Sequence, residues 1–461
     1  MSDTTADVLV IGSGQAGVPL AARLAARGKS VVLFERGPLG GTCVNRGCTP
    51  TKTMVASARA AHVARTAGRL GVEIRDVRVD LAAVVERKDA IVRRWQRGVE
   101  KRLGSAGDRL RLVRAAARFT GPRTLEAGDA RFRGDIVVID TGARPAVPDI
   151  PGLSSVPFLD STTILNVRQL PEHLVILGGG YIGCELGQMF RRFGSAVTIL
   201  ARGGHLLGRE DADVSAALED VMRSEGIALE LTASIESVRS DGEGGVVLKL
   251  GGGGKELAGT HLLVAVGRRP NTDELGCDAA GVTLDARGFV TTDDGYATSA
   301  PGVYAVGDVT GGPQFTHTSW DDHRILFERL MDNTARGKAD RLVPFTVFTD
   351  PQVAGVGLSE KEARARGVAY ELATMPFGDI ARAIEVDETA GLMKVLLDPA
   401  TERVLGARIV GAEAGELVHP FVVLMEAKAS LRAIVDAEFA HPTFAEGVQT
   451  LVMRLERYKL R

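Results

Sequence analysis

Residues 7–17 read DVLVIGSGQAG, a short apolar run that leads directly into a loop with the glycines Gly12, Gly14 and Gly17. An alanine-rich stretch of helical pattern covers residues 19–27, and a second apolar run over residues 31–34 ends at Glu35. This succession of strand, glycine loop, helix and strand predicts a βαβ unit. Its loop amides and helix N-terminus can hold a pyrophosphate, and an acid about 20 residues further on can bind a ribose.

The same plan recurs over residues 174–200, which predicts a second nucleotide-binding domain in the chain. Its loop glycines are Gly178, Gly180 and Gly183. Where the first copy has Glu35, the second has Ala201 followed by Arg202. A carboxylate would repel a 2′-phosphate, whereas arginine pairs with one. We therefore predict FAD in the first copy and NADPH in the second, with NADH possible; the alternative is that Arg202 only faces solvent.

Composition limits the class of protein further. The chain has 461 residues, a net charge of −2 and no basic block, which argues against nucleic acid or a membrane as a partner. Its N-terminal region is polar and acidic, so we expect no signal peptide and a cytoplasmic location. Of the four cysteines, Cys184 and Cys277 each stand alone and are expected to be buried apolar residues.

The other two cysteines, Cys43 and Cys48, form a close pair. Five positions on an ideal helix span about 7.5 Å along its axis and point to different faces, whereas a disulfide needs Cα atoms within about 7 Å. A bond therefore requires a distorted backbone, which Gly47 and Pro50 favour, and such a bond is a candidate for a reducible one. A metal site is the alternative, but it needs further ligands and no second cysteine pair exists, so we expect no metal. Lys52 would share a helix face with Cys48.

Residues 40–52, GGTCVNRGCTPTK, resemble the redox-active motif of the class I pyridine nucleotide-disulfide oxidoreductases, the mercuric-reductase-like and dihydrolipoamide dehydrogenase-like flavoproteins. The resemblance covers nearly the whole chain. It includes both glycine loops and the segments TG at 141–142, GRRPN at 267–271, AVGD at 305–308 and HPTFAE at 441–446.

The resemblance implies an α/β fold with two Rossmann-like nucleotide-binding domains, for FAD and NAD(P), and a C-terminal α+β dimerisation domain. The expected domains are an FAD-binding domain in two parts, an NAD(P)-binding domain and an interface domain. Their expected ranges are 1–147 with 267–340, then 148–266, then 341–461.

The resemblance also implies a catalytic role for particular residues. Cys43 would attack the substrate, Cys48 would interact with the flavin, and Lys52 would lie near the flavin and pair with Glu185. His441, oriented by Glu446, would be the acid–base, supplied by the partner subunit of a homodimer. A free thiol has a pKa of about 8.5, so a neighbouring imidazole that accepts its proton would keep Cys43 reactive.

A larger set of residues is expected to bind the cofactors, with Tyr181 shielding the flavin until the nicotinamide arrives. For FAD these are Gly12, Gly14, Gly17, Glu35, Gly41, Thr42, Lys52, Thr141, Gly142, Gly307 and Asp308. For the nicotinamide nucleotide they are Gly178, Gly180, Tyr181, Gly183, Arg202 and Gly267.

Departures from relatives favour a small disulfide or a thiol-reactive oxidant as the substrate. Mercuric reductases carry a C-terminal cysteine pair and lack the His-Pro-Thr signature, which disfavours mercury or another metal ion. Dihydrolipoamide dehydrogenases typically have an acid where Ala201 stands, so membership of a multienzyme complex is a weaker alternative. Residues 314–325 are similar to a mercuric-reductase-like branch that includes the reactive-chlorine-resistance flavoenzyme. A redox sensor without turnover is a further alternative.

Overall fold

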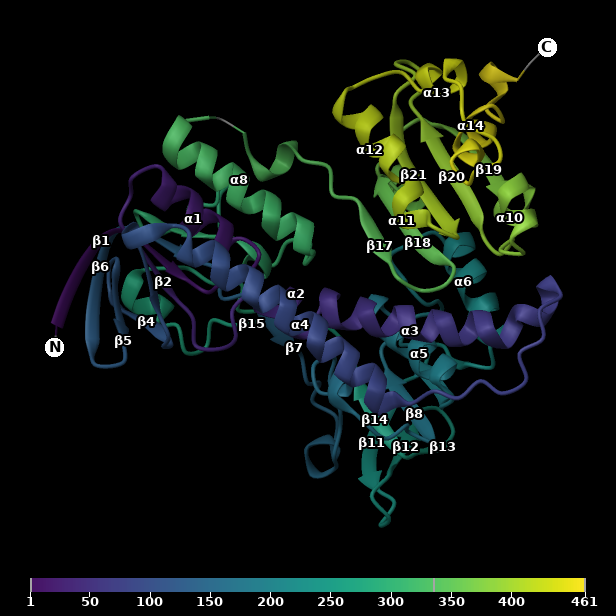
Figure 1. Ribbon diagram of the computed structural model, residues 1–461, viewed down its shortest axis with the longest axis horizontal. Coiled ribbons are helices and arrows are strands. Elements are labelled where there is room, and N and C mark those ends of the chain that lie inside the picture. The colour runs from purple at the N-terminus through teal and green to yellow at the C-terminus, as the bar shows by residue number, and fades with distance from the viewer. Residues whose placement is uncertain (1, 335, 460–461) are drawn as a thin grey trace. The chain divides into compact units, whose positions relative to one another are not determined.

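The computed structural model describes residues 2–334 and 336–459. The chain divides into two compact units, each built from separate stretches of sequence (Figure 1). Unit 1 comprises Met1–Thr53, Val85–Ala146 and Gly267–Arg341, and unit 2 comprises Met54–Val84, Val147–Val266 and Leu342–Arg461.

A mixed sheet forms the centre of unit 1. Its strands are β1 (Ser2–Ile11), β2 (Val31–Phe34), β3 (Leu110–Val113), β4 (Ala117–Gly121), β5 (Thr124–Ala127), β6 (Ala130–Ile139) and β16 (Val303–Ala305). Their order is β3-β2-β1-β6-β5-β4, with β16 also paired to β6. The pairs among β1, β2, β3, β6 and β16 are parallel, whereas β4 and β5 form an antiparallel extension. Parallel strands covered on both faces are apolar throughout, which explains the runs 8–11 and 31–34.

Helices accompany this sheet in unit 1. They are α1 (Gly17–Ala26), α2 (Gly41–Arg46), α7 (Cys277–Ala280), α8 (Thr316–Asp332) and parts of α3 (Cys48–Thr66) and α4 (Leu81–Gly104). Val8 and Val10 pack on one face with residues of α1 and α8, while Leu9 and Ile11 enter the core on the other face. A short antiparallel pair, β7 (Ala143–Pro145) with β15 (Arg268–Pro270), lies where the chain leaves and re-enters the unit.

Unit 2 contains a second parallel sheet, of order β10-β9-β8-β14, next to an antiparallel sheet, β11-β12-β13. The strands are β8 (His173–Leu177), β9 (Ala196–Leu200), β10 (Ala228–Glu230), β11 (Ile235–Ser240), β12 (Val246–Leu250), β13 (Glu256–Gly259) and β14 (His261–Val264), and the helices are α5 (Tyr181–Phe193) and α6 (Ala212–Ser224). Gly187 lets α5 approach the sheet closely, because a Cβ there would lie 2.9 Å from the Ile199 side chain.

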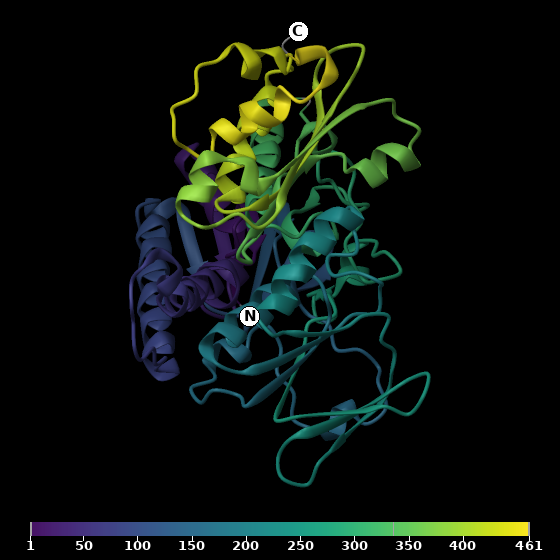
Figure 2. The same cartoon turned by 90° about the vertical axis from the view of Figure 1, so that its right-hand side faces the viewer.

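The C-terminal part of unit 2 is an antiparallel sheet of order β17-β18-β21-β20-β19 with short helices. The strands are β17 (Phe345–Val347), β18 (Gln352–Gly357), β19 (Glu371–Pro376), β20 (Leu392–Leu397) and β21 (Val404–Gly411). The helices are α9 (Glu360–Ala365), α10 (Ala381–Glu385), α11 (Ala414–Leu417), α12 (His419–Glu426), α13 (Arg432–Asp436) and α14 (Glu446–Val452). Figure 2 shows the yellow helices against these strands, where Val448, Leu451 and Phe421 join Met393 in one core.

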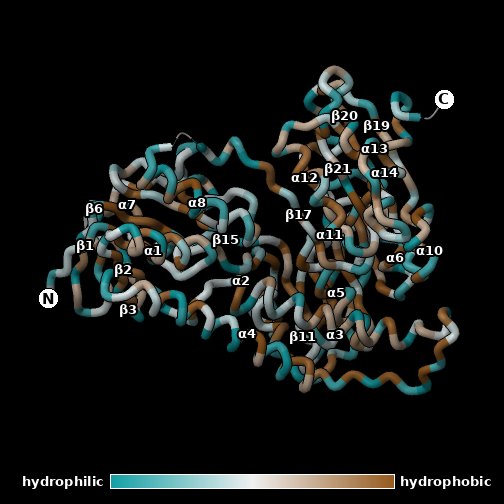
Figure 3. The backbone as a smooth tube through the Cα atoms, turned by 45° about the horizontal axis from the view of Figure 1, so that its top comes forward, coloured by the Kyte–Doolittle hydropathy of each residue, from teal (hydrophilic) through white to brown (hydrophobic). Residues whose placement is uncertain are grey.

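The structure confirms the predicted fold class, two Rossmann-like domains and a C-terminal α+β domain, while the three domain boundaries stay a prediction. Apolar residues concentrate in the strands and in the helix faces that cover them, as the colouring of Figure 3 shows. Both isolated cysteines, Cys184 and Cys277, are buried as expected. Among the residues described here, no helix is both long and apolar enough to cross a membrane.

Candidate active site

The first glycine loop closes against the end of β6 in unit 1. Gly12 has φ +108°, and a Cβ there would lie 2.2 Å from the Asp140 carbonyl oxygen. A side chain is therefore excluded by both conformation and space. A Cβ on Gly17 would lie 2.2 Å from the Gly12 carbonyl oxygen. The glycines of this loop thus bring bare backbone to the N-terminus of α1, where a pyrophosphate can approach.

Glu35 ends β2 and holds the loop in place. Its carboxylate accepts hydrogen bonds from the Ser13 backbone N–H at 3.0 Å and the Ser13 hydroxyl at 2.7 Å. The other oxygen accepts one from the Gly37 N–H at 2.7 Å. The acid predicted to bind a ribose therefore lies beside the glycine loop, with its charge balanced by donors from both sides.

Asp140 is a functional candidate that the sequence analysis missed. It is buried at the end of β6, and its carboxylate accepts a hydrogen bond of 2.7 Å from the Gly17 N–H. Cβ atoms on Gly14, Gly17 or Gly307 would each come within 2.8 Å of this carboxylate. Burial raises the pKa of Asp140 well above its ordinary value. Its place directly before Thr141-Gly142 was a signal that could have identified it.

The cysteine pair spans a break between two helices. α2 ends at Arg46, Gly47 has the non-helical dihedrals φ −130° and ψ −119°, and α3 begins at Cys48. The expected backbone distortion is therefore present, and Lys52 follows Cys48 in the same helix. Cys43 is partly buried and Cys48 is exposed.

The two thiols interact with each other and with the start of α8. A hydrogen bond with Cys48, together with burial, raises the pKa of Cys43. The Cys48 Sγ lies 3.1 Å from the Thr316 hydroxyl oxygen, and either atom can be the donor. Thr316, the first residue of α8, was not predicted, although its position at the start of a polar helical stretch offered a signal.

Asp308 and its surroundings lie near the end of β16. Its carboxylate lies 3.5 Å from the Arg268 guanidinium. Burial raises the pKa of Asp308, and the Arg268 charge opposes that shift. Neighbouring Gly307 donates its N–H to Asp322 at 2.7 Å. The Thr141 hydroxyl is buried without a hydrogen-bond partner among the described residues.

The second glycine loop, in unit 2, repeats the geometry of the first. A Cβ on Gly178, which has φ +122°, would lie 2.3 Å from the Ala265 carbonyl oxygen, and one on Gly183 would lie 1.9 Å from the Gly178 carbonyl oxygen. Gly180, by contrast, borders open space at the start of α5. The loop is packed against backbone at Gly178 and Gly183 and borders open space at Gly180. Such open space beside a helix N-terminus is what a pyrophosphate site requires.

Arg202 and His205 are exposed on the segment that follows β9. The His205 Nδ1 lies 3.2 Å from a Glu219 oxygen, and the same oxygen accepts the Leu206 N–H at 2.9 Å. The segment therefore presents a guanidinium and an oriented imidazole at the end of β9. His205 was missed because a lone histidine carries little information in a sequence.

Glu185 lies in α5, one turn after Tyr181. It is buried and accepts a hydrogen bond from the Phe348 N–H at 2.8 Å. Gly267, the last residue of the predicted nicotinamide set, has φ +132° and precedes β15 in unit 1. Its pairing with the nucleotide stays a prediction, as does the pairing of Glu185 with Lys52.

His441 and Glu446 lie together near the C-terminus. The His441 Nδ1 is 2.8 Å from a Glu446 oxygen, with 70% of the His441 side chain exposed and only 17% of Glu446. Glu446 starts α14 and its N–H donates to the Thr443 hydroxyl at 3.2 Å. The carboxylate is thus fixed by the helix, while the outer edge of the imidazole faces away from it.

Two family models of known proteins match this chain. Residues 6–322 match the family described as pyridine nucleotide-disulphide oxidoreductase, and residues 343–452 match the dimerisation domain of that family. This chain belongs to the pyridine nucleotide-disulphide oxidoreductase family. Its predicted membership is confirmed.

Particular relatives are similar over almost the full chain. A mercuric reductase of Staphylococcus aureus is 32% identical over 98% of this chain and 82% of its own length. A dihydrolipoyl dehydrogenase of Thermus scotoductus is 34% identical over 98% of each. A Cu(II) complex of the HOCl-induced flavoprotein disulfide reductase RclA of Escherichia coli has a TM-score of 0.89 and 34% identity, covering 97% of this chain and 99% of that one.

As a pyridine nucleotide-disulphide oxidoreductase, the protein is an enzyme that uses FAD and NAD(P)H, as predicted. The residues of unit 1 fit FAD: the three loop glycines leave the backbone accessible to a pyrophosphate, the Glu35 carboxylate lies beside this loop, and the Thr141 hydroxyl is buried without a hydrogen-bond partner among the described residues. The match to the dimerisation domain supports the predicted homodimer. No group of three or more His, Cys, Asp or Glu residues arranged to hold a metal occurs in ranges 2–334 and 336–459.

Proposed function

We propose that the enzyme uses NADPH to reduce a small disulfide or another thiol-reactive oxidant, with Cys43 and Cys48 as the working dithiol. The observation that carries this proposal is the placement of the two cysteines on either side of the helix break at Gly47, with the more exposed Cys48 sulfur 3.1 Å from the Thr316 hydroxyl oxygen. Two adjacent thiols can transfer two electrons by closing a disulfide, which is the stoichiometry of hydride donation.

The proposed reaction begins with the reduced pair. Cys43 loses its proton to a base and attacks one sulfur of the substrate, so that the substrate S–S bond breaks and the first thiolate leaves with a proton. Cys48 then attacks the Cys43 sulfur, releases the second thiol and closes the Cys43–Cys48 disulfide. FAD, which the first glycine loop and Glu35 would hold, would supply the two electrons from NADPH that reopen this disulfide.

His441 is the proposed acid–base. The raised pKa of Cys43 keeps the thiol protonated at neutral pH, so the attack needs a proton acceptor. Because Nδ1 of His441 faces Glu446, Nε2 is the nitrogen that takes this proton and returns it to the leaving thiolate. We propose that the partner subunit of the homodimer supplies this histidine, so that the active site is shared.

The preference for NADPH rests on the segment after β9. Arg202 and His205 are exposed there, and Ala201 occupies the position where a carboxylate would repel a 2′-phosphate. The remaining proposed roles follow the family resemblance: Tyr181 shields the flavin, and Lys52 pairs with Glu185. The sets of FAD and nicotinamide residues named above remain proposals, as do the four-part domain division and a cytoplasmic location.

A thiophilic metal ion such as Cu(II) is a second candidate substrate. The RclA structure of similar fold is a Cu(II) complex, and paired thiolates are soft ligands that favour copper. The His441–Glu446 pair favours the first candidate, because a proton donor serves a leaving thiolate and has no role in metal reduction. A lipoyl arm is disfavoured by the absence of an acid at Ala201.

A substrate panel tests the proposal. The holoenzyme is mixed with small disulfides, hypochlorite-oxidised thiols, quinones, Cu(II), Hg(II) and lipoamide, each with NADPH and with NADH, and the consumption of nicotinamide is followed. We expect the fastest turnover with a disulfide or oxidised thiol and NADPH. Faster turnover with NADH and lipoamide, or with a metal ion alone, contradicts the proposal, and a stoichiometric response without turnover supports a sensor instead.

A further inference from the structure

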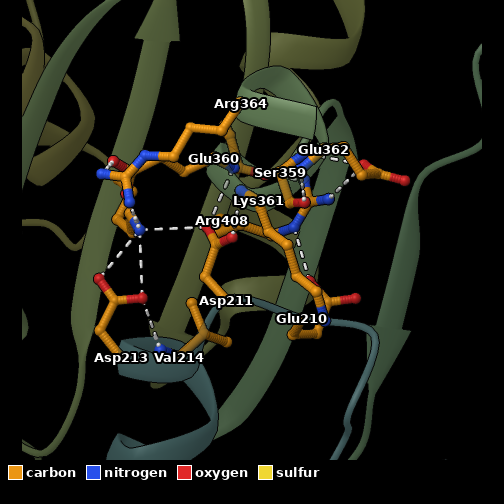
Figure 4. A network of polar contacts seen from close by, with 12 residues as sticks. Glu210, Asp211, Asp213, Val214, Ser359, Glu360, Lys361, Glu362, Arg364 and Arg408 are labelled. Carbon is orange, nitrogen blue, oxygen red and sulfur yellow. Dashed lines mark hydrogen bonds and ion pairs between the residues drawn. The ribbon is translucent and has the colours of Figure 1, made fainter. Parts of the chain in front are cut away.

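Glu210 and Asp211 are consecutive buried carboxylates at the end of the segment 201–211, and each pairs with a buried cation from the C-terminal sheet of unit 2 (Figure 4). The Arg408 Nε donates to Glu210 at 2.7 Å, and both side chains are 5% exposed. Lys394 Nζ lies 3.1 Å from Asp211. Since Arg408 lies in β21 and Lys394 in β20, the end of this segment is fixed to two neighbouring strands.

The Glu210–Arg408 anchor continues through Phe345 to Tyr181. The Arg408 guanidinium carbon lies 5.4 Å from the centroid of the Phe345 ring, and the Tyr181 ring stacks on Phe345 with centroids 5.7 Å apart and planes inclined by 20°. Burial raises the pKa of the Tyr181 hydroxyl, and Glu210 raises it further through its charge and a hydrogen bond. The Tyr181 ring therefore stacks on Phe345, and Phe345 in turn contacts the Arg408 guanidinium that Glu210 binds.

The Lys394 cluster provides a contrast within the same segment. Its ammonium group contacts the carboxylates of Asp211, Asp213 and Glu360. These contacts fix the segment and the start of α6 to the sheet, and none of them involves Tyr181 or Phe345. Fixing the segment therefore does not require Glu210, which leaves the Glu210–Arg408 pair available for a more specific task.

The same segment also touches the second glycine loop. The Leu207 N–H donates to the Gly179 carbonyl oxygen at 2.8 Å, and a Cβ on Gly179 would lie 2.8 Å from the Ala201 Cβ. One short stretch of chain thus carries Arg202, the proposed 2′-phosphate contact, at its start and Glu210 at its end. The segment 201–211 therefore links the proposed nucleotide site to the residues that contact Tyr181.

We propose that Glu210, held by Arg408, is a positioning residue that restrains Tyr181 against Phe345 and sets how easily the Tyr181 ring yields to an incoming nicotinamide. This inference rests on the role of Tyr181 stated under the proposed function. Tyr181 makes its contacts at the first residue of α5, so rotation of the side chain requires no movement of the helix. The energy of the restraint then adds directly to the cost of nucleotide binding.

The test measures reduction of the flavin by NADPH in the holoenzyme by rapid mixing, in the absence of disulfide substrate. Glu210→Gln preserves shape but weakens a charge-assisted hydrogen bond, and Arg408 keeps its bonds to the carbonyl oxygens of Val356, Ala407 and Gly357. We expect the dissociation constant for NADPH in this half-reaction to fall by about fivefold to tenfold. Tyr181→Phe is expected to act in the same direction and to a similar extent.

The double variant Glu210→Gln/Tyr181→Phe decides whether Glu210 acts through Tyr181. We expect it to behave like Tyr181→Phe alone, whereas effects that multiply would overturn the proposal. Phe345→Leu removes the ring on which Tyr181 stacks, so we expect it also to tighten NADPH binding; it replaces Glu210→Gln if that variant does not fold. Asp211→Asn is the matched control: it removes the neighbouring anchor and lowers the melting temperature, but leaves NADPH binding unchanged.

Failure of the restraint can be separated from failure of the shield. If Tyr181→Ala and Tyr181→Phe both leave flavin reduction by NADPH unchanged, the proposed role of Tyr181 is wrong. The proposed restraint by Glu210, which acts through Tyr181, is then wrong as well. If Tyr181→Ala alters flavin reduction while Glu210→Gln and Phe345→Leu do not, the proposed role of Tyr181 is supported and the proposed restraint by Glu210 is overturned.

Discussion

The carboxylate of Asp140 accepts a 2.7 Å hydrogen bond from the backbone N–H of Gly17, a residue 123 positions away in the sequence. This bond joins the end of β6 to the first residue of α1, and it fills the space that three glycines leave empty. The proposed FAD loop therefore owes its shape to an acid outside the glycine fingerprint.

Two replacements of Asp140 should show whether its carboxylate acts as the hydrogen-bond acceptor for the Gly17 N–H or through its charge. Asp140→Ala leaves the Gly17 N–H buried without a partner, so we expect a loss of about 1–3 kcal/mol in the free energy of unfolding and weaker FAD retention. Asp140→Asn keeps a side-chain acceptor of the same shape for the Gly17 N–H, so we expect a smaller loss. Urea unfolding and flavin content measure both; equal losses in the two variants would contradict this role.

Replacement of either cysteine of the pair should abolish substrate reduction while FAD stays bound. In Cys43→Ser the substrate has no attacking thiol, and in Cys48→Ser the mixed disulfide cannot be resolved. Cys184→Ser is the control, because this buried thiol lies outside the pair. NADPH consumption with a disulfide is the measurement, and substantial turnover in either variant would rule out the dithiol mechanism.

Loss of Arg202 should affect NADPH and spare NADH. Arg202→Ala removes a charged contact with the 2′-phosphate, so we expect a loss of about 1.5–3 kcal/mol in NADPH binding. Arg239→Ala, which changes another exposed arginine of unit 2, serves as the control. Michaelis constants for both nucleotides decide the matter, and an equal change for the two would show that Arg202 makes no contact with the phosphate.

The His441–Glu446 pair should matter for the disulfide step alone. With His441→Gln we expect turnover with disulfide to fall by about 10²- to 10⁴-fold, as for other lost general acid–base groups. Flavin reduction by NADPH should stay unchanged, since the proton is transferred in the later step. His419→Gln is the control, because His419 is exposed at the start of α12 and outside the proposed site. A parallel loss in both half-reactions would contradict the assignment.

Because His323 is buried, we expect the free energy of unfolding to decrease in mild acid. Burial lowers the pKa of His323 from 6.5 to about 4, so the folded protein keeps the imidazole neutral where the unfolded chain protonates it. The unfolded state then binds more protons between these two values, and stability falls as the pH drops from 6.5 towards 4. Urea unfolding across this range should show a shallower fall in His323→Gln than in the natural protein. Parallel curves would contradict the assignment.

Local patterns account for what the sequence could predict. Both glycine loops and the helix break at Gly47 are encoded within a few residues, so their spacing suffices to predict them. The His441–Glu446 pair was predicted from the family resemblance, and its two residues lie only five positions apart. Asp140, Thr316 and Phe345 act on residues far away in the chain, on Gly17, Cys48 and Tyr181 respectively. Such contacts depend on strand order and helix placement, which no local pattern specifies. The folded chain was needed to find them.

The late position of β16 has a consequence for biosynthesis. Residues 137–139 of β6 gain β16 as a neighbour only through residues 303–305, and all of the stretch 147–266 is synthesised between the two strands. On the ribosome, the emerging chain therefore holds an incomplete sheet while the inserted stretch is made. We expect unit 1 to finish folding late in translation, and a nascent chain stalled before residue 303 to expose a parallel edge that invites aggregation or a chaperone.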